Sequence, residues 1–362
     1  MDLLLTLDYE LCGNGAGDVM RDVICPTNRI LNICDSHGAK MTIMFEVGEY
    51  WAFQKYESQL RENLGYSPSE LMRGQVVDAI RRGHDVQLHL HPQWINAQYA
   101  QGVWRLSNSC WRLADLPDGL GDRDCLTSIT GALTVGKQTL EGIIEPVAED
   151  YQCVCFRAGG FYAQPSQNVI SAMKRAGLRA DSSVVKGYKV RAPFAVDYSH
   201  VKTGRTAWWT TDTELTMEGN PGENIMELSV SSQMEPYWMH FRKTKLRSVL
   251  MYWRIENGSR RNHTIDTNVS SLPGCRRLLG KMLRKHPSLF DFCTLSSKSM
   301  LGRIEEHARW PEEPVVIIGH SKDFVNDREL DRFLALLGRN EIVNCQTIFE
   351  HVQRAVSVLD LA

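Results

Sequence analysis

The sequence predicts an α/β protein built on parallel strands. Short apolar runs that are typical of buried strands alternate along the chain with longer segments of helical periodicity, which is the pattern of β–α–β units. The chain has 362 residues, of which 43% are hydrophobic and 23% are charged, so it can bury a large core. It contains no internal repeat and no low-complexity tract, and we expect a single domain over residues 1–362.

The expected strands and helices follow one another in alternating order. Strands are expected over residues 3–8, 41–47, 85–91, 153–157, 180–184, 224–230 and 315–320. Helices are expected over residues 27–37, 68–82, 131–148, 165–176 and 327–337.

The first expected strand ends in two acidic residues. An apolar run over residues 3–7 is followed by Asp8, Tyr9 and Glu10. Side chains two apart on a strand share a face, and parallel α/β sheets carry their chemistry at the carboxyl ends of the strands. Of two such acids, one can bind a metal while the other takes a proton from water. Solvated charge at the end of a strand is the simpler alternative, and it stays open at this point.

Three histidines fall within eight residues around the third expected strand. Apolar residues alternate with polar ones over residues 86–90, so His89 and His91 project from the same face of an extended segment. Two neutral imidazoles on one rigid element suit a zinc-like ion. His84 lies farther back, and we expect it to be structural. The stretch therefore predicts a metal site.

Six segments of the chain resemble motifs of the polysaccharide deacetylases of carbohydrate esterase family four, also called the NodB-homology family. They occur in the family's order over residues 3–320. The segments are 6–10 (TLDYE), 41–48 (MTIMFEVG), 83–89 (GHDVQLH), 156–162 (FRAGGFY), 176–183 (AGLRADSS) and 315–320 (VVIIGH). On these motifs the chain resembles a divergent, cytoplasmic-type member of the family.

This resemblance implies a fold and a metal site. The implied fold is a distorted (β/α)7 barrel with helical insertions. Glu10, His89 and His91 are implied to hold a divalent metal, with zinc as the expected ion, and to leave a position open for water and substrate.

The resemblance also implies roles for residues around the metal. Asp8 is the implied general base, and Arg157 holds it in place and keeps it ionised. His320 is the implied general acid for the leaving amine. Asp181 is implied to orient such a histidine or to support the loop, and a turn or N-cap role is an equal alternative.

Three further residues are expected to line the substrate. A backbone N–H near Gly160 to Tyr162 is expected to stabilise negative charge on the carbonyl oxygen. Trp94 is expected to form one wall of the pocket, although a tryptophan in the core is an equally ordinary interpretation.

The chain departs from the family pattern at two places. The family's second ligand histidine lies four residues after the first, but position 93 is Gln, so His91 is the nearest candidate. The proline of the family's Arg-x-Pro-Tyr motif is replaced by Gly159 and Gly160, which makes that loop more permissive in its backbone angles.

Composition limits the surroundings in which the protein acts. The formal net charge is −2, which argues against general affinity for nucleic acids. No apolar run approaches the roughly 20 residues of a membrane span, and no secretory signal is visible, so we expect a cytoplasmic protein. The ten cysteines are scattered without a zinc-binding pattern, and we expect most of them to be small core residues.

Two insertions interrupt the alternation of strands and helices. Residues 95–124 carry Trp104 and Trp111 and are placed to cover the pocket, or else form a surface excursion with a small core of its own. Residues 234–309 are basic, with twelve Lys or Arg against two acids over residues 241–285. This insertion could recognise phosphate on a lipid-linked or nucleotide-linked sugar, contact an anionic membrane peripherally through residues 276–285, or present a solvated face.

Together these features predict a metal-dependent carbohydrate deacetylase. The expected reaction removes an acetyl, or alternatively a formyl, group from an amino sugar that is a small-molecule or lipid-linked precursor of a surface polysaccharide or glycoconjugate. Two alternatives stay open: a metal-free pseudo-enzyme that binds a saccharide, and a hydrolase of a non-sugar amide on the same barrel.

Overall fold

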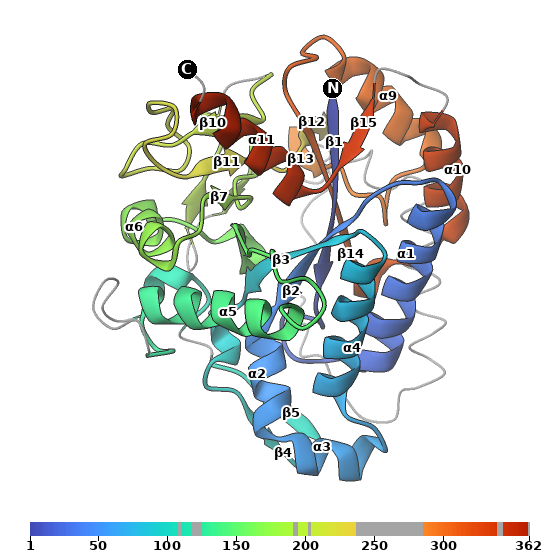
Figure 1. Cartoon of the computed structure of the whole chain (residues 1–362), viewed down its shortest axis with the longest axis vertical. Helices are drawn as coiled ribbons and strands as arrows, with labels where there is room; N and C mark the ends of the chain where they lie inside the picture. The colour runs from blue at the N-terminus through green and yellow to red at the C-terminus, as the bar shows by residue number, and fades with distance from the viewer. Residues whose placement is uncertain are drawn as a thin grey trace, which may run out of the picture.

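The computed structural model shows a mixed α/β protein, which confirms the predicted fold class (Figure 1). It describes residues 1–107, 110–116, 125–190, 195–201, 204–236, 285–338 and 343–360. All seven expected strands are present and run parallel to their neighbours in one sheet. They are β1 (Asp2–Tyr9), β2 (Thr42–Glu46), β3 (Asp85–Leu90), β6 (Cys155–Ala158), β7 (Ala180–Asp181), β11 (Met226–Leu228) and β14 (Val315–His320).

The sheet follows the order β10-β11-β7-β6-β3-β2-β1-β14. Strand β10 (Ala207–Trp209) is antiparallel to β11, and β15 (Asn344–Gln346) adds to the first residues of β1. The sheet curls strongly, as a parallel bridge between Val230, just after β11, and Val316 of β14 shows. The two edges of the parallel run therefore meet.

Helices flank the strands on the outside of the curl (Figure 1). The five expected helices are present as α1 (Cys25–Ser36), α4 (Pro68–Arg81), α5 (Ile129–Ile144), α6 (Ser166–Ala176) and α10 (Asp327–Leu337). Helices α2 (Val47–Lys55), α3 (Glu57–Leu64), α9 (Ser297–His307) and α11 (Ile348–Asp360) add to them. Three two-stranded ribbons lie outside this sheet: β4 (Gln98–Ala100) with β5 (Val103–Arg105), β8 (Lys189–Val190) with β9 (Val196–Asp197), and β12 (Ser232–Pro236) with β13 (Lys285–Leu289).

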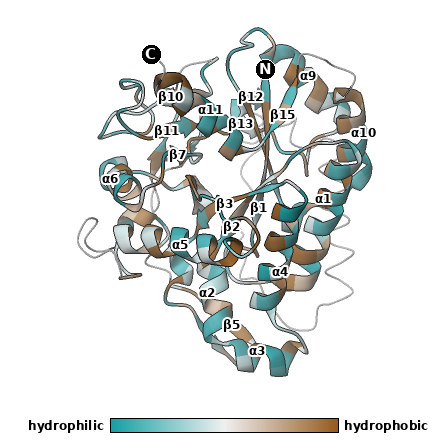
Figure 2. Ribbon diagram, in the orientation of Figure 1, coloured by the Kyte–Doolittle hydropathy of each residue, from teal (hydrophilic) through white to brown (hydrophobic). Residues whose placement is uncertain are grey.

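The core lies between the strands and these helices. Four leucines of β1, at positions 3, 4, 5 and 7, are fully buried, as expected for a strand covered on both faces. Figure 2 shows hydrophobic residues on the central strands, whereas the outer helices carry both hydrophobic and hydrophilic stripes. Within the residues described above, no helix is both long enough and apolar enough to cross a membrane.

Asp85, the first residue of β3, anchors the C-terminal helix. Its carboxylate accepts hydrogen bonds from Thr42 Oγ1 (3.2 Å), from Gln87 Nε2 (2.9 Å) and from the backbone N–H of Phe349 in α11 (3.2 Å). Burial raises the pKa of Asp85 to about 6, against the opposing effect of these hydrogen bonds. In the unfolded chain an aspartate titrates near about 3.9.

This raised pKa makes stability depend on pH. The folded state binds the proton more tightly, so the stabilisation is complete below about pH 4 and is lost as pH rises through about 6. Two pKa units correspond to roughly 3 kcal/mol. Relative to wild type, the Asp85→Asn variant should therefore gain roughly 3 kcal/mol of unfolding free energy when the pH is raised from 4 to 7. Urea unfolding at both pH values measures it, and an unchanged difference would contradict the assignment.

Candidate metal centre

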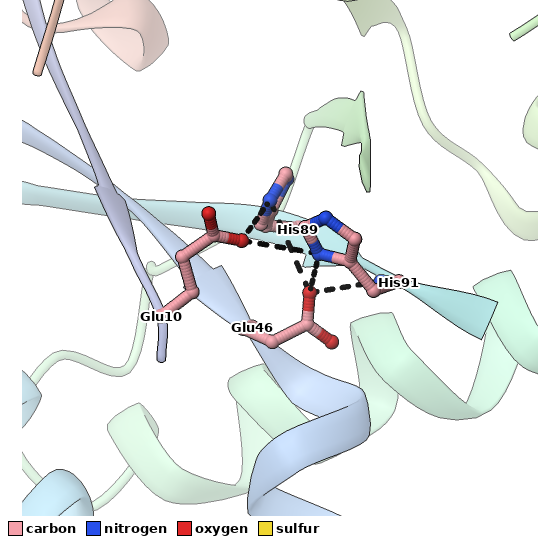
Figure 3. Close-up of side chains that lie close together, drawn as sticks. All are labelled: Glu10, Glu46, His89 and His91. Atoms are coloured by element: carbon pink, nitrogen blue, oxygen red, sulfur yellow. Dashed lines mark hydrogen bonds and ion pairs between the residues drawn. The ribbon is translucent and has the colours of Figure 1, made fainter. Parts of the chain in front are cut away.

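Four buried side chains meet at the carboxyl ends of three neighbouring strands (Figure 3). Glu10 follows β1, Glu46 is the last residue of β2, His89 lies near the end of β3, and His91 follows β3 directly. The parallel register pairs Glu46 with His89, so the strand ends deliver these groups to one place. Each residue contributes one possible ligand atom, and these atoms all lie within 4.8 Å of one another.

The distances define a common centre for the four groups. Oε2 of Glu10 lies 3.1 Å from Nε2 of His89 and 3.1 Å from Nδ1 of His91. Oε2 of Glu46 lies 2.8 Å from Nδ1 of His91 and 3.9 Å from Nε2 of His89. One oxygen from each carboxylate and one nitrogen from each imidazole therefore face the same point.

The atoms that face away from this point are held by hydrogen bonds. Nδ1 of His89 lies 2.9 Å from the backbone oxygen of Arg157, which can only accept, so Nδ1 donates to it and Nε2 is the nitrogen directed at the cluster, 3.1 Å from Glu10 Oε2. The second oxygen of Glu10 accepts a 2.5 Å hydrogen bond from Lys322 Nζ, and the second oxygen of Glu46 accepts one of 2.9 Å from Gly48 N. Each of these hydrogen bonds thus orients the side chain so that its other polar atom points at the centre of the cluster.

Charges in the cluster shift the pKa values of its members. Burial opposes ionisation of Glu10, but Lys322 and His91 hold its pKa well below the usual value. Burial also opposes the charged form of His91, yet the carboxylates of Glu10 and Glu46 raise its pKa well above the usual value. The nearby carboxyl of Glu49 has its pKa raised well above normal by burial and by Glu46 and Glu10. The surroundings therefore favour the ionised form of Glu10 and disfavour the ionised form of Glu49.

The donor set fits a divalent metal ion. Two imidazole nitrogens and two carboxylate oxygens, all buried, are ligands that zinc accepts, and iron(II) and manganese also use this mixture. A cation at the centre would replace the proton that otherwise separates the two carboxylates from His91. The cluster could therefore hold a metal ion.

A second group of charged residues lies beside the cluster. Asp8 Oδ1 forms a 2.6 Å ion pair with Arg157 Nη1, and Asp8 Oδ2 lies 3.6 Å from His320 Nε2. The register of β1 and β14 pairs Asp8 directly with His320. Arg157 is 0% exposed and also binds Thr6 Oγ1 and Ser182. Despite burial, Arg157, His89 and His320 lower the pKa of Asp8.

Asp181 is placed to support a loop. Its carboxylate accepts hydrogen bonds of 2.8 and 2.9 Å from the N–H and hydroxyl of Ser183, whose Oγ accepts one from Ala158 N at 2.8 Å. The carboxylates within ion-pair distance of His320 are instead those of Asp8 and Asp323, the latter at 3.9 Å. The contacts of Asp181 with Ser183 are those of a turn aspartate that also supports the loop, and its role in catalysis stays a prediction.

Trp94 lies in a position that matches the second of its two interpretations, a tryptophan in the core. It is only 1% exposed, and its ring contacts the rings of Phe53 and Trp104 at centroid distances of 6.0 and 5.2 Å. The 95–124 insertion thus forms a small aromatic core with Trp94 through β4 and β5, because an indole is better stabilised by other rings than by water. Residues 108–109 and 117–124 lie outside the described residues, as do residues 237–284 of the basic insertion.

The loop after β6 approaches the cluster closely. Gly160 has a φ of +60° next to the half-buried Tyr162, a conformation that favours glycine. A Cβ atom on Gly159 would lie 2.4 Å from Cγ and Cδ2 of His91. The absence of a side chain at Gly159 is therefore what lets the His91 ring reach the cluster.

The structure adds three residues that the sequence did not single out. Glu46 completes the cluster, Lys322 binds Glu10, and Glu49 accepts hydrogen bonds from Leu11 N at 2.9 and 3.1 Å. Glu46 carries the same signal as Asp8 and Glu10, an acid at the end of an apolar strand, and could have been found by it. Lys322 and Glu49 carry no such signal. His84 lies at the other end of β3, where it contacts Asp35 and Met41.

No model of a known protein family matches the chain, and no curated protein matches its sequence. A protein provisionally named a polysaccharide deacetylase, from Mycobacterium smegmatis, aligns with 98% of this chain and 90% of its own at 12% identity and a TM-score of 0.46. Puue allantoinase aligns over 98% and 89% at 10% identity and a TM-score of 0.45. A 4-alpha-glucanotransferase from Thermococcus litoralis aligns over 98% of this chain and 38% of its own, at 12% identity and a TM-score of 0.43.

Proposed function

We propose that this protein is a metal-dependent hydrolase that removes an acetyl, or alternatively a formyl, group from an amino sugar. The observation that carries the proposal is the buried cluster of Glu10, Glu46, His89 and His91, with the paired Asp8 and His320 beside it. A metal site next to a separate base and acid provides the groups that metal-dependent hydrolysis of an amide uses.

The metal would be held by the four residues of the cluster, with zinc as the proposed ion. When bound, such an ion supplies Lewis acidity: it polarises a carbonyl group and makes a water molecule easier to deprotonate. The 2.9 Å contact of His89 Nδ1 with the Arg157 oxygen and the 2.5 Å contact of Glu10 with Lys322 keep the ligand atoms in place.

Asp8 would accept the proton of the attacking water. Arg157 keeps Asp8 ionised. Its 2.6 Å contact engages Oδ1 of Asp8, so Oδ2 is the oxygen that would accept the proton. His320 Nε2 lies 3.6 Å from that oxygen and would donate a proton to the leaving nitrogen. Backbone N–H groups near Gly160 and Tyr162 would stabilise the negative charge on the carbonyl oxygen.

The choice of an amino sugar rests on the six sequence motifs that resemble the deacetylase family. We propose accordingly that the curled sheet is the distorted (β/α)7 barrel of that family. We propose further that the substrate is a precursor of a surface polysaccharide or glycoconjugate, handled in the cytoplasm.

Metal analysis together with a substrate screen tests this function. We expect one divalent ion per chain, and acetate release from at least one acetamido sugar in a screen that also contains cyclic ureides and imides. His89→Ala should lose the ion and lower kcat/KM by at least about a thousandfold, since ligand and activation are lost together. His84→Ala, in the same stretch but outside the cluster, should keep both metal and activity. If the protein hydrolyses only a ureide or an imide, its substrate is a non-sugar amide and not an amino sugar. A folded protein that binds no metal and hydrolyses none of the compounds would contradict the proposal.

A further inference from the structure

A cavity of about 370 Å³ lies between the β12–β13 ribbon and helix α9. Val315, the first residue of β14, lines it, whereas His320 at the other end of β14 lies beside Asp8. The cavity shares no residue with the metal cluster. Its volume falls in the range of about 300–1,000 Å³ that is usual for small-molecule sites.

Among the residues that the structure describes, several polar groups at this cavity have no hydrogen-bond partner. The Lys186 ammonium makes no hydrogen bond or ion pair with the described part of the chain. His307 Nε2 lies 3.2 Å from the Glu313 backbone oxygen, which only accepts, so Nε2 carries the proton and Nδ1 is a free acceptor. Gln233 uses its amide nitrogen on Glu306 at 2.5 Å, which leaves its amide oxygen available. Donors and acceptors thus line the cavity together.

An indole ring forms an apolar wall of the cavity. Trp310 is 36% exposed, and its ring contacts the His307 ring at a centroid distance of 6.1 Å. Gly204 has a φ of +87°, and a Cβ atom there would lie 2.7 Å from the indole. The backbone therefore packs closely against the indole, which fixes the ring while part of its surface stays accessible. A fixed aromatic face beside polar groups is suited to a sugar ring, which has apolar C–H faces and polar edges.

The charges that line the cavity cancel. The lining contains two cations, Lys186 and Arg303, and two carboxylates, Glu235 and Glu306. Arg303 is already engaged with Glu235 at 3.1 Å and with the Ser288 and Leu289 backbone oxygens. Burial lowers the pKa of His307, which keeps it neutral. A diphosphate only accepts hydrogen bonds, so it would meet one free cation and several acceptors, whereas a hydroxyl group can both donate and accept.

We infer that this cavity is a second binding site whose ligand is a neutral, hydroxyl-rich saccharide. The ring of the sugar packs on Trp310, and its hydroxyl groups bond to Lys186, His307 Nδ1 and the Gln233 amide oxygen. The inference goes beyond the proposed function, because it concerns a site separate from the metal cluster and holds whether or not that cluster hydrolyses an amide.

Calorimetric titration of the full chain tests this site. The probes are neutral tetrasaccharides of N-acetylglucosamine, glucose and mannose, with uridine diphosphate and inorganic diphosphate as anionic probes. We expect at least one tetrasaccharide to bind. Trp310→Ala and Lys186→Met should each weaken that binding at least tenfold. Met217→Ala, an exposed residue outside the cavity, should bind as wild type does, and so should His89→Ala, which removes a cluster ligand.

Each other result has a defined meaning. The inference is overturned if no tetrasaccharide binds, if both cavity variants bind like wild type, or if a diphosphate binds more tightly than every sugar. Loss of binding in His89→Ala would place the sugar at the metal cluster instead. If the wild-type protein hydrolyses no acetamido sugar but still binds a tetrasaccharide in the cavity, the proposed function is removed and this site is left intact.

Discussion

Replacing Glu46 by glutamine should weaken metal binding at least about a hundredfold. Glu46 Oε2 faces both histidines of the cluster, and an amide there removes one of the two negative charges that favour a cation. Outer contacts of metal ligands alone are worth about 10- to 100-fold in affinity, so the loss of a ligand should cost at least as much. Competition against a chelator with known zinc affinity measures the change.

The matched control for this variant is Glu49→Gln. Glu49 is also buried near the cluster, but both of its oxygens accept hydrogen bonds from Leu11 N, and burial with the charges of Glu46 and Glu10 raises its pKa well above normal. Glutamine keeps the volume of the side chain and an acceptor for Leu11 N, so metal affinity should stay within about threefold. If both variants lose the same metal affinity, Glu46 acts only through the negative charge near the cluster and is not a ligand. The ligand set would then be Glu10, His89 and His91.

The strand ends explain why much of the fold could be predicted from the sequence. An apolar run such as β1 has few ways to be buried on both faces, and an acid that follows it must lie where the packed interior stops. The same reasoning placed Asp8 and Glu10 at the carboxyl end of β1, and the resemblance to the deacetylase family added His320. The register of β1 and β14 brings Asp8 and His320 together as pairing partners. The apolar pattern of the strand and the pairing of the strands thus lead to the same place for these residues.

Contacts between distant segments could not be predicted in this way. Lys322 reaches Glu10 across 312 positions of sequence, and nothing in its own surroundings indicates an active-site contact. Trp94 follows the histidine strand closely, but the aromatic side chains that bury it come from the 95–124 insertion and from α2. These partners depend on how the elements pack.

Two departures from the family pattern, which appeared unrelated in the sequence, are physically coupled. His91 stands two residues after His89, and glycine at position 159 stands where a side chain would meet the His91 ring. Gly159→Ala should therefore displace His91 from the cluster and destabilise the metal-free protein by about 1–3 kcal/mol, the usual cost of overpacking. Metal affinity should fall as well, because Nδ1 of His91 moves away from Glu10 and Glu46.

A double-mutant cycle separates this steric coupling from a general effect of alanine in the loop. In the His91→Ala background the ring is absent, so Gly159→Ala should cost little, and the coupling energy measured by urea unfolding without metal should be about 1–3 kcal/mol. Gly142→Ala in α5 is the control, because open space surrounds that position and alanine favours a helix by up to about 1 kcal/mol. Additive costs of the Gly159 and His91 substitutions would contradict the coupling. The position of His91 would then depend on Glu46, whose oxygen also accepts its backbone N–H at 2.8 Å, and not on the glycine.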